Sequence, residues 1–325
     1  MSAAASRATR RALSSVLAAA ASASASASAS SAGGGVAATT TTMMSSHGRG
    51  ALFATTLRAA TAAHHRESSS LRGFASSASA SAETSSSPGI FEFRTDVVIP
   101  ANRNDYLATC YEREYREARV SIHEGAFLGM WTVETGGDLN EITHVYHYRD
   151  YDHRDVVRAN VKGAKDEEAW ACFQADAWPY VKSMKSEIFL PATNALAAGG
   201  VAADAHAHLA SVVAADAKDN GVFEMRRYQL ELGYNPVPKL IEHMSEGLPS
   251  KLAADEKKLG TLAWMGYSDL GGLNQFVELW RYDTCEDHMK VRESARGAEA
   301  WKACIGKIAP MVQSFDTKLM RLWLP

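Results

Sequence analysis

Apolar and polar residues alternate at the start of two distant segments of this chain. Phe91-Glu92-Phe93-Arg94 begins the first segment and Phe223-Glu224-Met225-Arg226 begins the second. A period of two is typical of β-strands. Later landmarks return in the same order, at an offset of about 131 to 134 residues: Leu139-Asn140 and Leu273-Asn274, Tyr148 and Tyr282, Arg158 and Arg292, Trp170 and Trp301, Pro179 and Pro310. The chain therefore contains a duplicated domain.

Each repeat predicts the same order of elements, β-α-β-β-α-β. The first copy predicts strands over 91–99, 126–134, 140–148 and 183–190, one helix over about 104–119, and helical segments across 154–182. In the second copy Pro236 opens the corresponding first helix, and 314–324 is the last strand. This order is the ferredoxin-like unit, whose helices lie on one face of an antiparallel sheet. We therefore predict an α+β fold in which two such sheets cover each other's bare faces, as in a dimeric α+β barrel.

Composition divides the chain into five segments. Residues 1–74 are rich in Ala, Ser and Arg, contain no Lys, and have Glu67 as their one acidic residue, which is typical of an organelle transit peptide. We predict a disordered mitochondrial transit peptide that directs the protein to the matrix, with a chloroplast as the alternative address. The other predicted segments are a flexible arm over 75–88, a first repeat over 89–191, an Ala-rich linker over 192–220 and a second repeat over 221–325.

The net charge of the chain makes nucleic acid an unfavourable partner. The whole chain has 34 Lys+Arg and 37 Asp+Glu, of which residues 1–74 contain 7 Arg and 1 Glu. The remaining body has 27 basic and 36 acidic residues, a net charge of about −9. An acidic body disfavours nucleic acid, whose phosphates require neutralisation. No run of 18 apolar residues follows the leader, so no membrane-spanning helix is expected.

The alternation also predicts which side chains share a face of each sheet. We expect the face of Phe91 and Phe93 to meet the helices of its own repeat, and the opposite face to meet the other repeat inside the barrel. A polar cavity with aromatic walls, of the kind that often binds small molecules, would then be lined by Glu92, Arg94, His144, Tyr146, Glu224, Arg226, Glu278 and Trp280. Four tryptophans are predicted to fill the core of their own repeats: Trp131, Trp170, Trp264 and Trp301.

Several interpretations of these polar residues remain open. Glu92–Arg94 and Glu224–Arg226 are structural ion pairs, or they hold a ligand, or they take part in catalysis. His144 is either a hydrogen-bonded core histidine or a base, ligand or pH sensor. No metal site or cofactor is predicted, because the four cysteines form no CxxC pair and the chain has no GxGxxG, GxxxxGK[ST] or GxSxG motif.

The repeated motifs resemble those of the NIPSNAP family. They are FEFR at 91–94, FEMR at 223–226, LNEITHVYHY at 139–148 and LNQFVELWRY at 273–282, followed by the repeated Arg, Trp and Pro. The resemblance implies a dimeric α+β barrel, a mitochondrial address, and an association with autophagy of damaged mitochondria and with vesicular transport. It implies no established enzymatic activity. The family's histidine on the third strand is present as His144, but Glu278 stands in its place in the second repeat.

Two functions follow as hypotheses. In the first, the chain is a non-enzymatic mitochondrial scaffold that presents a rigid surface to protein partners, in mitochondrial quality control or vesicle-related processes. In the second, the barrel binds a small molecule or haem and is a cofactor-independent monooxygenase, in which Glu92, Arg94, His144 and Tyr146 take part. The barrel closes within one chain or forms in a homo-oligomer, and the sequence leaves both arrangements open.

Overall fold

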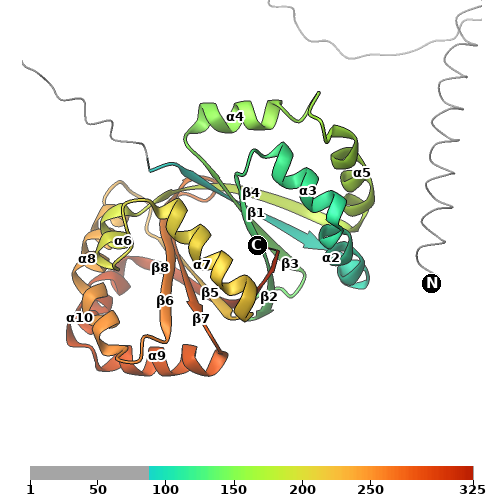
Figure 1. Cartoon of the computed structure of the whole chain (residues 1–325). Coiled ribbons are helices and arrows are strands. Elements are labelled where there is room, and N and C mark those ends of the chain that lie inside the picture. The colour runs from blue at the N-terminus through green and yellow to red at the C-terminus, as the bar shows by residue number, and fades with distance from the viewer. Residues whose placement is uncertain (1–87, 325) are drawn as a thin grey trace, which may run out of the picture. The chain divides into compact units, whose positions relative to one another are not determined.

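Eight antiparallel strands form a barrel that is closed within one chain (Figure 1). The computed structural model describes residues 88–324, so the predicted transit peptide and nearly all of the flexible arm lie outside the described residues. The strands are β1 (Ile90–Val98), β2 (Phe127–Thr135), β3 (Glu141–Tyr148) and β4 (Val181–Pro191) in the first repeat, and β5 (Val222–Leu230), β6 (Gly260–Leu270), β7 (Gln275–Tyr282) and β8 (Val312–Leu324) in the second. The predicted α+β class is confirmed.

The two repeats are joined along two seams. Around the ring the strands follow the order β1-β3-β2-β8-β5-β7-β6-β4. Each repeat keeps the ferredoxin-like order, with its first and third strands in the middle. At one seam β2 pairs with β8, and at the other β4 pairs with β6. The sheet therefore has no free edge that a second chain would have to cover.

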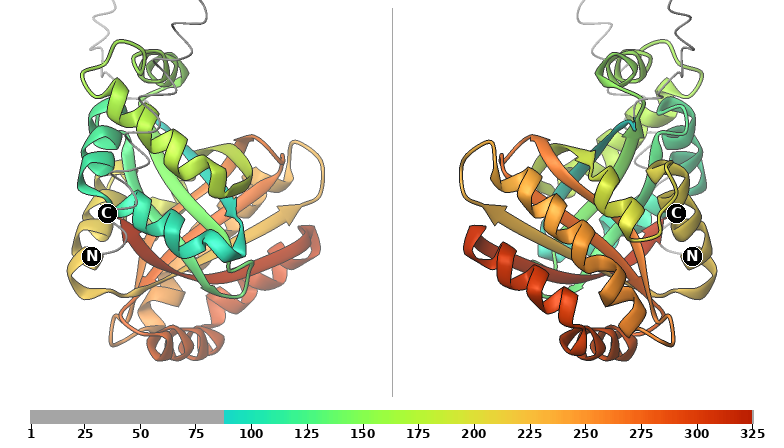
Figure 2. Two further views of the ribbon diagram at one scale, coloured as in Figure 1. Left: turned by 90° about the vertical axis from the view of Figure 1, so that its right-hand side faces the viewer. Right: turned by 90° about the vertical axis from the view of Figure 1, so that its left-hand side faces the viewer.

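The helices lie outside the barrel, as two side views show (Figure 2). They are α2 (Arg103–Tyr111), α3 (Arg113–Ile122), α4 (Tyr151–Ala159) and α5 (Glu167–Ala177) in the first repeat, and α8 (Pro236–Ala254), α9 (Cys285–Gly297) and α10 (Glu299–Ile308) in the second. Helices α4 and α9 begin at equivalent caps, where Asp150 and Thr284 accept hydrogen bonds from backbone N–H groups three residues later. The single helix predicted over about 104–119 is wrong, because Glu112 takes an extended ψ of 133° and separates α2 from α3.

The predicted Ala-rich linker contains two helices, α6 (Thr193–Ala198) and α7 (Ala205–Asp219). Helix α7 contacts β2, β6 and β8. Strands β2 and β6 lie on opposite sides of the ring, so a helix that touches both must cross one mouth of the barrel. Its apolar face, with Leu209, Val212 and Val213, is buried in the same hydrophobic cluster as the barrel interior. The segment between the repeats is thus part of the core.

Aromatic side chains from both repeats fill the barrel. The rings of Phe91 and Phe93 on β1 lie 5.0 and 5.2 Å from the ring of Trp264 on β6, centroid to centroid. Trp131 on β2 lies 5.5 Å from Phe223 on β5. Two of the predicted core tryptophans therefore pack against the opposite repeat, not only within their own. The interior is a packed core, as is usual for a barrel of eight strands.

The predicted orientation of the polar face is wrong in both repeats. Val145 belongs to the interior cluster, whereas its neighbour His144 lies on the outer face with Ile142, which packs among residues of α2 and α5. Glu92 likewise contacts α4. A period of two assigns side chains to two faces but does not identify the inner one, and here both faces are covered. The charged face lies outside because water and cationic side chains reach the clefts beneath the helices, whereas the barrel interior is closed.

The aromatic interior generates a stability prediction. Trp264→Ala removes a ring that contacts both phenylalanines of β1, so we expect the free energy of unfolding to fall by about 3–5 kcal/mol. Trp178→Ala is the matched control, since Trp178 is 45% exposed, and its loss should be below about 1 kcal/mol. Urea unfolding followed by circular dichroism measures both. Equal losses would mean that the barrel interior does not hold the repeats together.

Candidate functional site

In the first repeat, Glu92 is the centre of a charged cluster beneath α4. Its carboxylate accepts hydrogen bonds from Arg154 Nε (2.8 Å), Arg158 Nη2 (2.7 Å) and Ser186 Oγ (2.8 Å). Burial alone would raise the pKa of Glu92, but the two guanidinium groups lower it below its usual range. The predicted ion pair with Arg94 is wrong, because Arg94 donates to a different carboxylate. Glu92 is thus fully engaged in holding α4 on the sheet.

Asp96, Tyr106 and His144 form a second buried group in this repeat. Tyr106 of α2 donates to Asp96 Oδ2 (2.8 Å), and His144 Nε2 lies 3.3 Å from the Tyr106 hydroxyl and 3.4 Å from the same carboxylate oxygen. Arg94 Nε donates to Asp96 Oδ1 (3.2 Å). Burial lowers the pKa of His144, so the ring is neutral at pH 7. This engagement favours the interpretation of His144 as a core histidine.

A cleft of about 570 Å³ opens beside Glu92, between the sheet and helices α4 and α5. His123 lines this cleft and is 1% exposed, yet neither ring nitrogen has a hydrogen-bond partner among residues 88–324. Its ring meets Tyr146 and Trp170 edge-on, with centroids 5.0 and 5.2 Å apart. Burial and the charge of Arg158 lower the pKa of His123 to about 3. The predicted residue Tyr146 therefore lies behind the wall of the cleft.

The second repeat has the corresponding cluster around Glu224. The carboxylate accepts hydrogen bonds from Arg226 Nη2 (2.8 Å), the Tyr282 hydroxyl (3.0 Å) and the Thr317 hydroxyl (3.0 Å). His288 Nε2 of α9 lies 3.2 Å from Glu224 Oε1. Burial opposes ionisation, but His288 and Arg226 lower the pKa of Glu224 well below its usual range. The predicted ion pair of Glu224 with Arg226 is confirmed, although it faces the helices.

Glu278 takes the place that His144 has in the first repeat. Its carboxylate oxygens accept hydrogen bonds from the Tyr228 hydroxyl (2.6 Å) and the Trp280 indole N–H (2.6 Å). Arg226 Nη1 lies 3.8 Å from it, so one guanidinium is shared by two carboxylates. Burial and the charge of Glu278 raise the pKa of Tyr228 well above its usual value, so this hydroxyl remains a hydrogen-bond donor.

Helices α4 and α9 present different side chains at matching positions. Counted from their N-terminal caps, Arg154 of α4 corresponds to His288 of α9, and Arg158 corresponds to Arg292. Both arginines of α4 bind the carboxylate of the first cluster. In the second cluster Arg226 and His288 take that role, and Arg292 forms no ion pair within the described part of the chain. The guanidinium group of Arg292 therefore has no carboxylate partner among the described residues.

Lys251, in the last turn of α8, is a fully buried amine. Its Nζ lies 3.4 Å from the ring centroid of Trp280 and 4.9 Å from that of Trp301, and no described residue hydrogen-bonds to it. Burial and the charge of Arg226 lower the pKa of Lys251 to about 7. The matching position in the last turn of α3 is Arg119, which is buried against two phenylalanine rings. The two repeats thus place different cations at one position.

A cleft of about 850 Å³ lies beside Lys251, between helices α9 and α10 and strands β5 and β8. It has the same place in its repeat as the smaller cleft has in the first. The described residues that line it include no carboxylate, and its cations are Arg226, Lys251, Arg292, Arg296 and Lys302. Its apolar walls are formed by Tyr228, Trp301, Ile305, Ile308, Val312 and Phe315. The cleft therefore combines positive charge with apolar surface.

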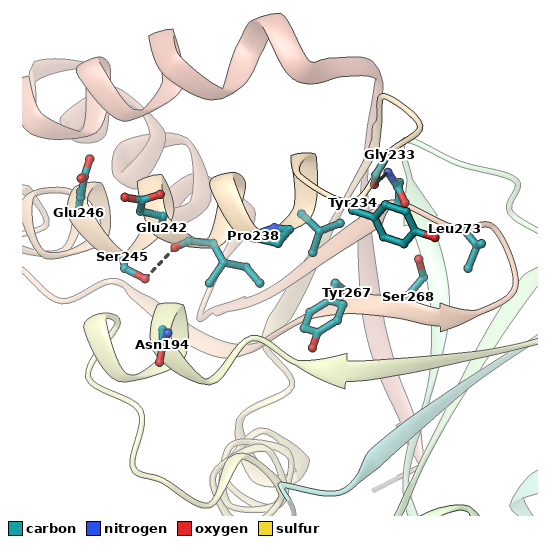
Figure 3. A pocket seen from close by; sticks show the side chains of 13 residues that line it. Asn194, Gly233, Tyr234, Pro238, Glu242, Ser245, Glu246, Tyr267, Ser268 and Leu273 are labelled. Atoms are coloured by element: carbon teal, nitrogen blue, oxygen red, sulfur yellow. Dashed lines mark hydrogen bonds between the residues drawn. The ribbon is translucent and has the colours of Figure 1, made fainter.

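A third hollow, of about 800 Å³, lies along the first half of α8 (Figure 3). Tyr234 and Tyr267 line it, and Glu242 and Glu246 of α8 lie along it. Tyr234 is completely exposed, and the nearby Leu232 is 88% exposed. We call this hollow the α8 groove. It is an apolar surface with an acidic side, and it is separate from the two charged clefts.

The eight predicted site residues divide equally between the two repeats, four in each, and none lies at the barrel centre. Sequence reasoning missed the partners that the helices supply, which are His123, Arg154, Arg158, Lys251 and Arg292. The sequence does contain a pattern that indicates Lys251. It lies on one face of α8 with the other buried residues of that helix, Leu240, Met244, Gly247 and Leu248. A lysine on the apolar face of an amphipathic helix is an exception that periodicity alone could have found.

Within residues 88–324, no group of His, Cys, Asp and Glu is arranged to hold a metal ion. None of the helices there is both long and apolar enough to cross a membrane. All four cysteines are free thiols. The described residues therefore offer charged side chains, imidazoles, hydroxyls, free thiols and one buried amine.

Lys251 leads to a prediction about pH and stability. In the unfolded chain its amine binds a proton up to a pKa near 10.5, but in the folded chain it releases the proton near pH 7. Between these values the unfolded chain binds more protons, so this group makes the free energy of unfolding rise with pH, by at most about 1.4 kcal/mol per unit. Lys251→Met removes that slope. The free energy of unfolding of the variant, minus that of the original protein, should therefore be higher at about pH 7 than at about pH 9.5. Urea unfolding by circular dichroism measures this; a constant difference would contradict the buried amine.

Comparison with known proteins identifies the family of this chain. Protein NipSnap homolog 3A of Pongo abelii is 32% identical over 101 residues, which are 31% of this chain and 38% of that relative, so the match spans less than half of the relative's length. A NipSnap homolog of Dictyostelium discoideum is 23% identical over 191 residues, 59% of this chain and 72% of the relative. The solved structure of a NIPSNAP family protein from Agrobacterium tumefaciens is 21% identical, covers 32% of this chain and 92% of its own, and has a TM-score of 0.29. The NIPSNAP family model matches residues 91–195 and 223–324, one match in each repeat. Since these matches cover more than half of the chain, it belongs to the NIPSNAP family.

Proposed function

We propose that this chain binds a small organic acid in the cleft of its second repeat. The observation that carries the proposal is the unpaired Arg292, in a cleft whose described lining contains five cations and no carboxylate. A guanidinium binds a carboxylate through two parallel hydrogen bonds, which makes it well suited to this ligand class. The volume of about 850 Å³ is within the usual range for small-molecule sites.

The two ends of the ligand would meet different surfaces. Arg292 and Arg296 of α9 would receive the carboxylate, since neither has a carboxylate partner among residues 88–324. Trp301, Ile305 and Phe315 would pack against an apolar body. Binding would therefore favour acids that carry an aromatic or branched aliphatic group.

The first repeat is a weaker candidate for the same ligand. Arg158 corresponds to Arg292 and is already paired with Glu92. Arg154, which corresponds to His288, is paired with the same carboxylate. An acid in that cleft would have to displace a buried carboxylate from its partners, which is costly. A haem in the first repeat is disfavoured too, because the Nε2 of His144 already contacts Tyr106 and a carboxylate. The proposed ligand site therefore lies in the second repeat, outside the barrel, and not at the barrel centre.

The acid site generates a binding prediction. We use 3-phenyllactate as the probe, because it combines a carboxylate with an aromatic body. Arg292→Met should weaken binding by about 10- to 100-fold, the usual effect of losing a charge-assisted hydrogen bond. Lys290→Met is the matched control on the same helix, since Lys290 pairs with Asp287 and does not line the cleft. Calorimetry measures both affinities. Unchanged affinity in the Arg292 variant would exclude this site.

A scaffold role is a second candidate function, and the α8 groove favours it. Its fully exposed Tyr234 and the neighbouring Leu232 leave a large apolar surface in water, which often marks a protein interaction site. Glu242 adds negative charge beside it, whereas Glu246 is already paired with Lys307 (2.7 Å). The occupant that fits is an apolar segment of a partner protein that carries a basic residue. This docking would serve the proposed role in mitochondrial quality control or vesicle-related processes.

The proposed site of action is the mitochondrial matrix. Support comes from the Arg-rich, acid-poor composition of residues 1–74 and from the membership in the NIPSNAP family. This segment lies outside the described residues, and a chloroplast stays the alternative. Deletion of residues 1–74 tests the address in the same cells that are used to search for partners.

Site-specific photo-cross-linking tests the scaffold proposal. A photoreactive amino acid in place of Tyr234 should form reproducible adducts with a defined partner in isolated mitochondria, and deletion of residues 1–74 should remove both the adducts and the mitochondrial pool. Tyr111 is the control position, because it is 56% exposed and belongs to the other repeat. Peptide mapping of the adduct should identify an apolar segment with a basic residue. Identical adducts from both positions, or none from Tyr234, would refute the docking role of the groove.

A further inference from the structure

Lys251 has properties that a simple acid-binding site does not require. A lysine that only supplies positive charge would reach water or a carboxylate, whereas the Nζ of Lys251 has no hydrogen-bond partner among the described residues and is 2% exposed. It lines the second cleft, and the faces of Trp280 and Trp301 flank it. A structural cation at this position needs no amine, since the first repeat has Arg119 there. The exchange to lysine adds one capability, which is nucleophilic chemistry.

We propose that Lys251 forms an imine with the carbonyl group of a 2-oxo acid bound in the second cleft. This inference rests on the proposed function, because the carboxylate of the oxo acid would use the same arginines. It adds to that function a ligand class and a covalent step.

The neighbouring charges favour an oxo group beside the carboxylate. Arg292 of α9 lines the same cleft as Lys251. In a 2-oxo acid the carbonyl carbon is directly bonded to the carboxylate. A carboxylate held by Arg292 would therefore keep its own carbonyl in the charged part of the cleft that Lys251 also lines, whereas a carbonyl far along the chain would be carried toward the apolar walls.

The covalent step needs no reagent beyond the ligand. The lone pair of neutral Nζ attacks the carbonyl carbon, and the carbonyl π electrons move to oxygen, which takes a proton to give a carbinolamine. The oxygen then leaves as water with the two hydrogens that began on Nζ, and a carbon–nitrogen double bond remains. No oxidant or reductant is consumed, and the cleft opens to solvent, so the water can leave.

The amine must be neutral for this attack, and the groups packed around Lys251 make it so near pH 7. Arg226 of β5 and Arg292 of α9 disfavour the ammonium form, while Glu224 of β5 and Glu278 of β7 favour it. Burial of Lys251 is the largest effect, and together with the two arginines it lowers the pKa of this amine to about 7. A desolvated lysine beside other cations is a known arrangement for imine-forming amines. Imine formation should therefore rise with pH through about 7, far below the range of an exposed lysine.

Reductive trapping tests the inference on the whole protein. Phenylpyruvate is the probe, borohydride reduces any imine to a stable amine, and peptide mass spectrometry locates the adduct. We expect one adduct, on the peptide that contains Lys251, with a yield that rises through about pH 7. Lys251→Arg introduces the residue type of the first repeat, a cation without a nucleophilic amine, and should abolish the adduct. Lys290→Met is the matched control, since Lys290 is an exposed lysine of α9 that does not line the cleft, and it should leave trapping at Lys251 intact.

Binding of 3-phenyllactate, which has no oxo group, separates this inference from the acid site. If phenyllactate binds through Arg292 and phenylpyruvate is never trapped, imine formation is wrong and the acid site stands. If neither acid binds, both ideas fail together. Adducts spread over exposed lysines and undiminished in Lys251→Arg would also overturn the inference. The Lys251→Arg variant must itself bind phenyllactate, which shows that it is folded and that only the covalent step is lost.

Discussion

Closure of the barrel around aromatic rings determines where every polar group of this fold can lie. The interior is occupied by Phe91, Phe93, Trp131, Phe223 and Trp264, whose contacts join the two repeats. Helices cover the opposite face of the central strands β1, β3, β5 and β7. Polar residues on that face are buried without being inside the barrel, and burial of an unpaired charge is very costly. Side chains of the helices must therefore pair with these buried charges. A cleft in which a charged side chain has no such partner is a candidate site.

A tandem arrangement allows those partners to diverge between the halves. In a symmetric dimer of identical chains, a substitution changes both sites at once. Here Arg154 in one repeat stands where His288 stands in the other, and His144 stands where Glu278 stands. The first repeat has two arginines on one carboxylate, and the second has one arginine between two carboxylates. One frame thus carries two electrostatically different clefts.

The sequence predicted the frame well and the site poorly, for a definite physical reason. Alternation and duplication identified the strands, the order of elements and the α+β class, because these depend on local periodicity. Alternation placed Glu92 and Arg94 on one face correctly, but it could not tell the inner face from the outer one, since both are buried. Arg154 and Lys251 lie on helices, 62 and 29 positions away from the strand residues that they meet, Glu92 and Trp280. Their contacts follow from three-dimensional packing, which single-sequence periodicity does not contain.

The position shared by Arg119 and Lys251 illustrates what this divergence allows. Arginine stays charged in any protein environment, so the first repeat must stabilise a buried cation, and two phenylalanine faces contribute to this. Lysine has a second option, because it can release its proton when burial and neighbouring cations disfavour the charge. A neutral buried amine costs far less than an isolated buried ion, but near pH 7 it must also release its proton, which costs about 1.4 kcal/mol for each unit by which its pKa is lowered. The second repeat is therefore less stable near neutral pH because of Lys251, and it holds at this position an amine that the first repeat lacks.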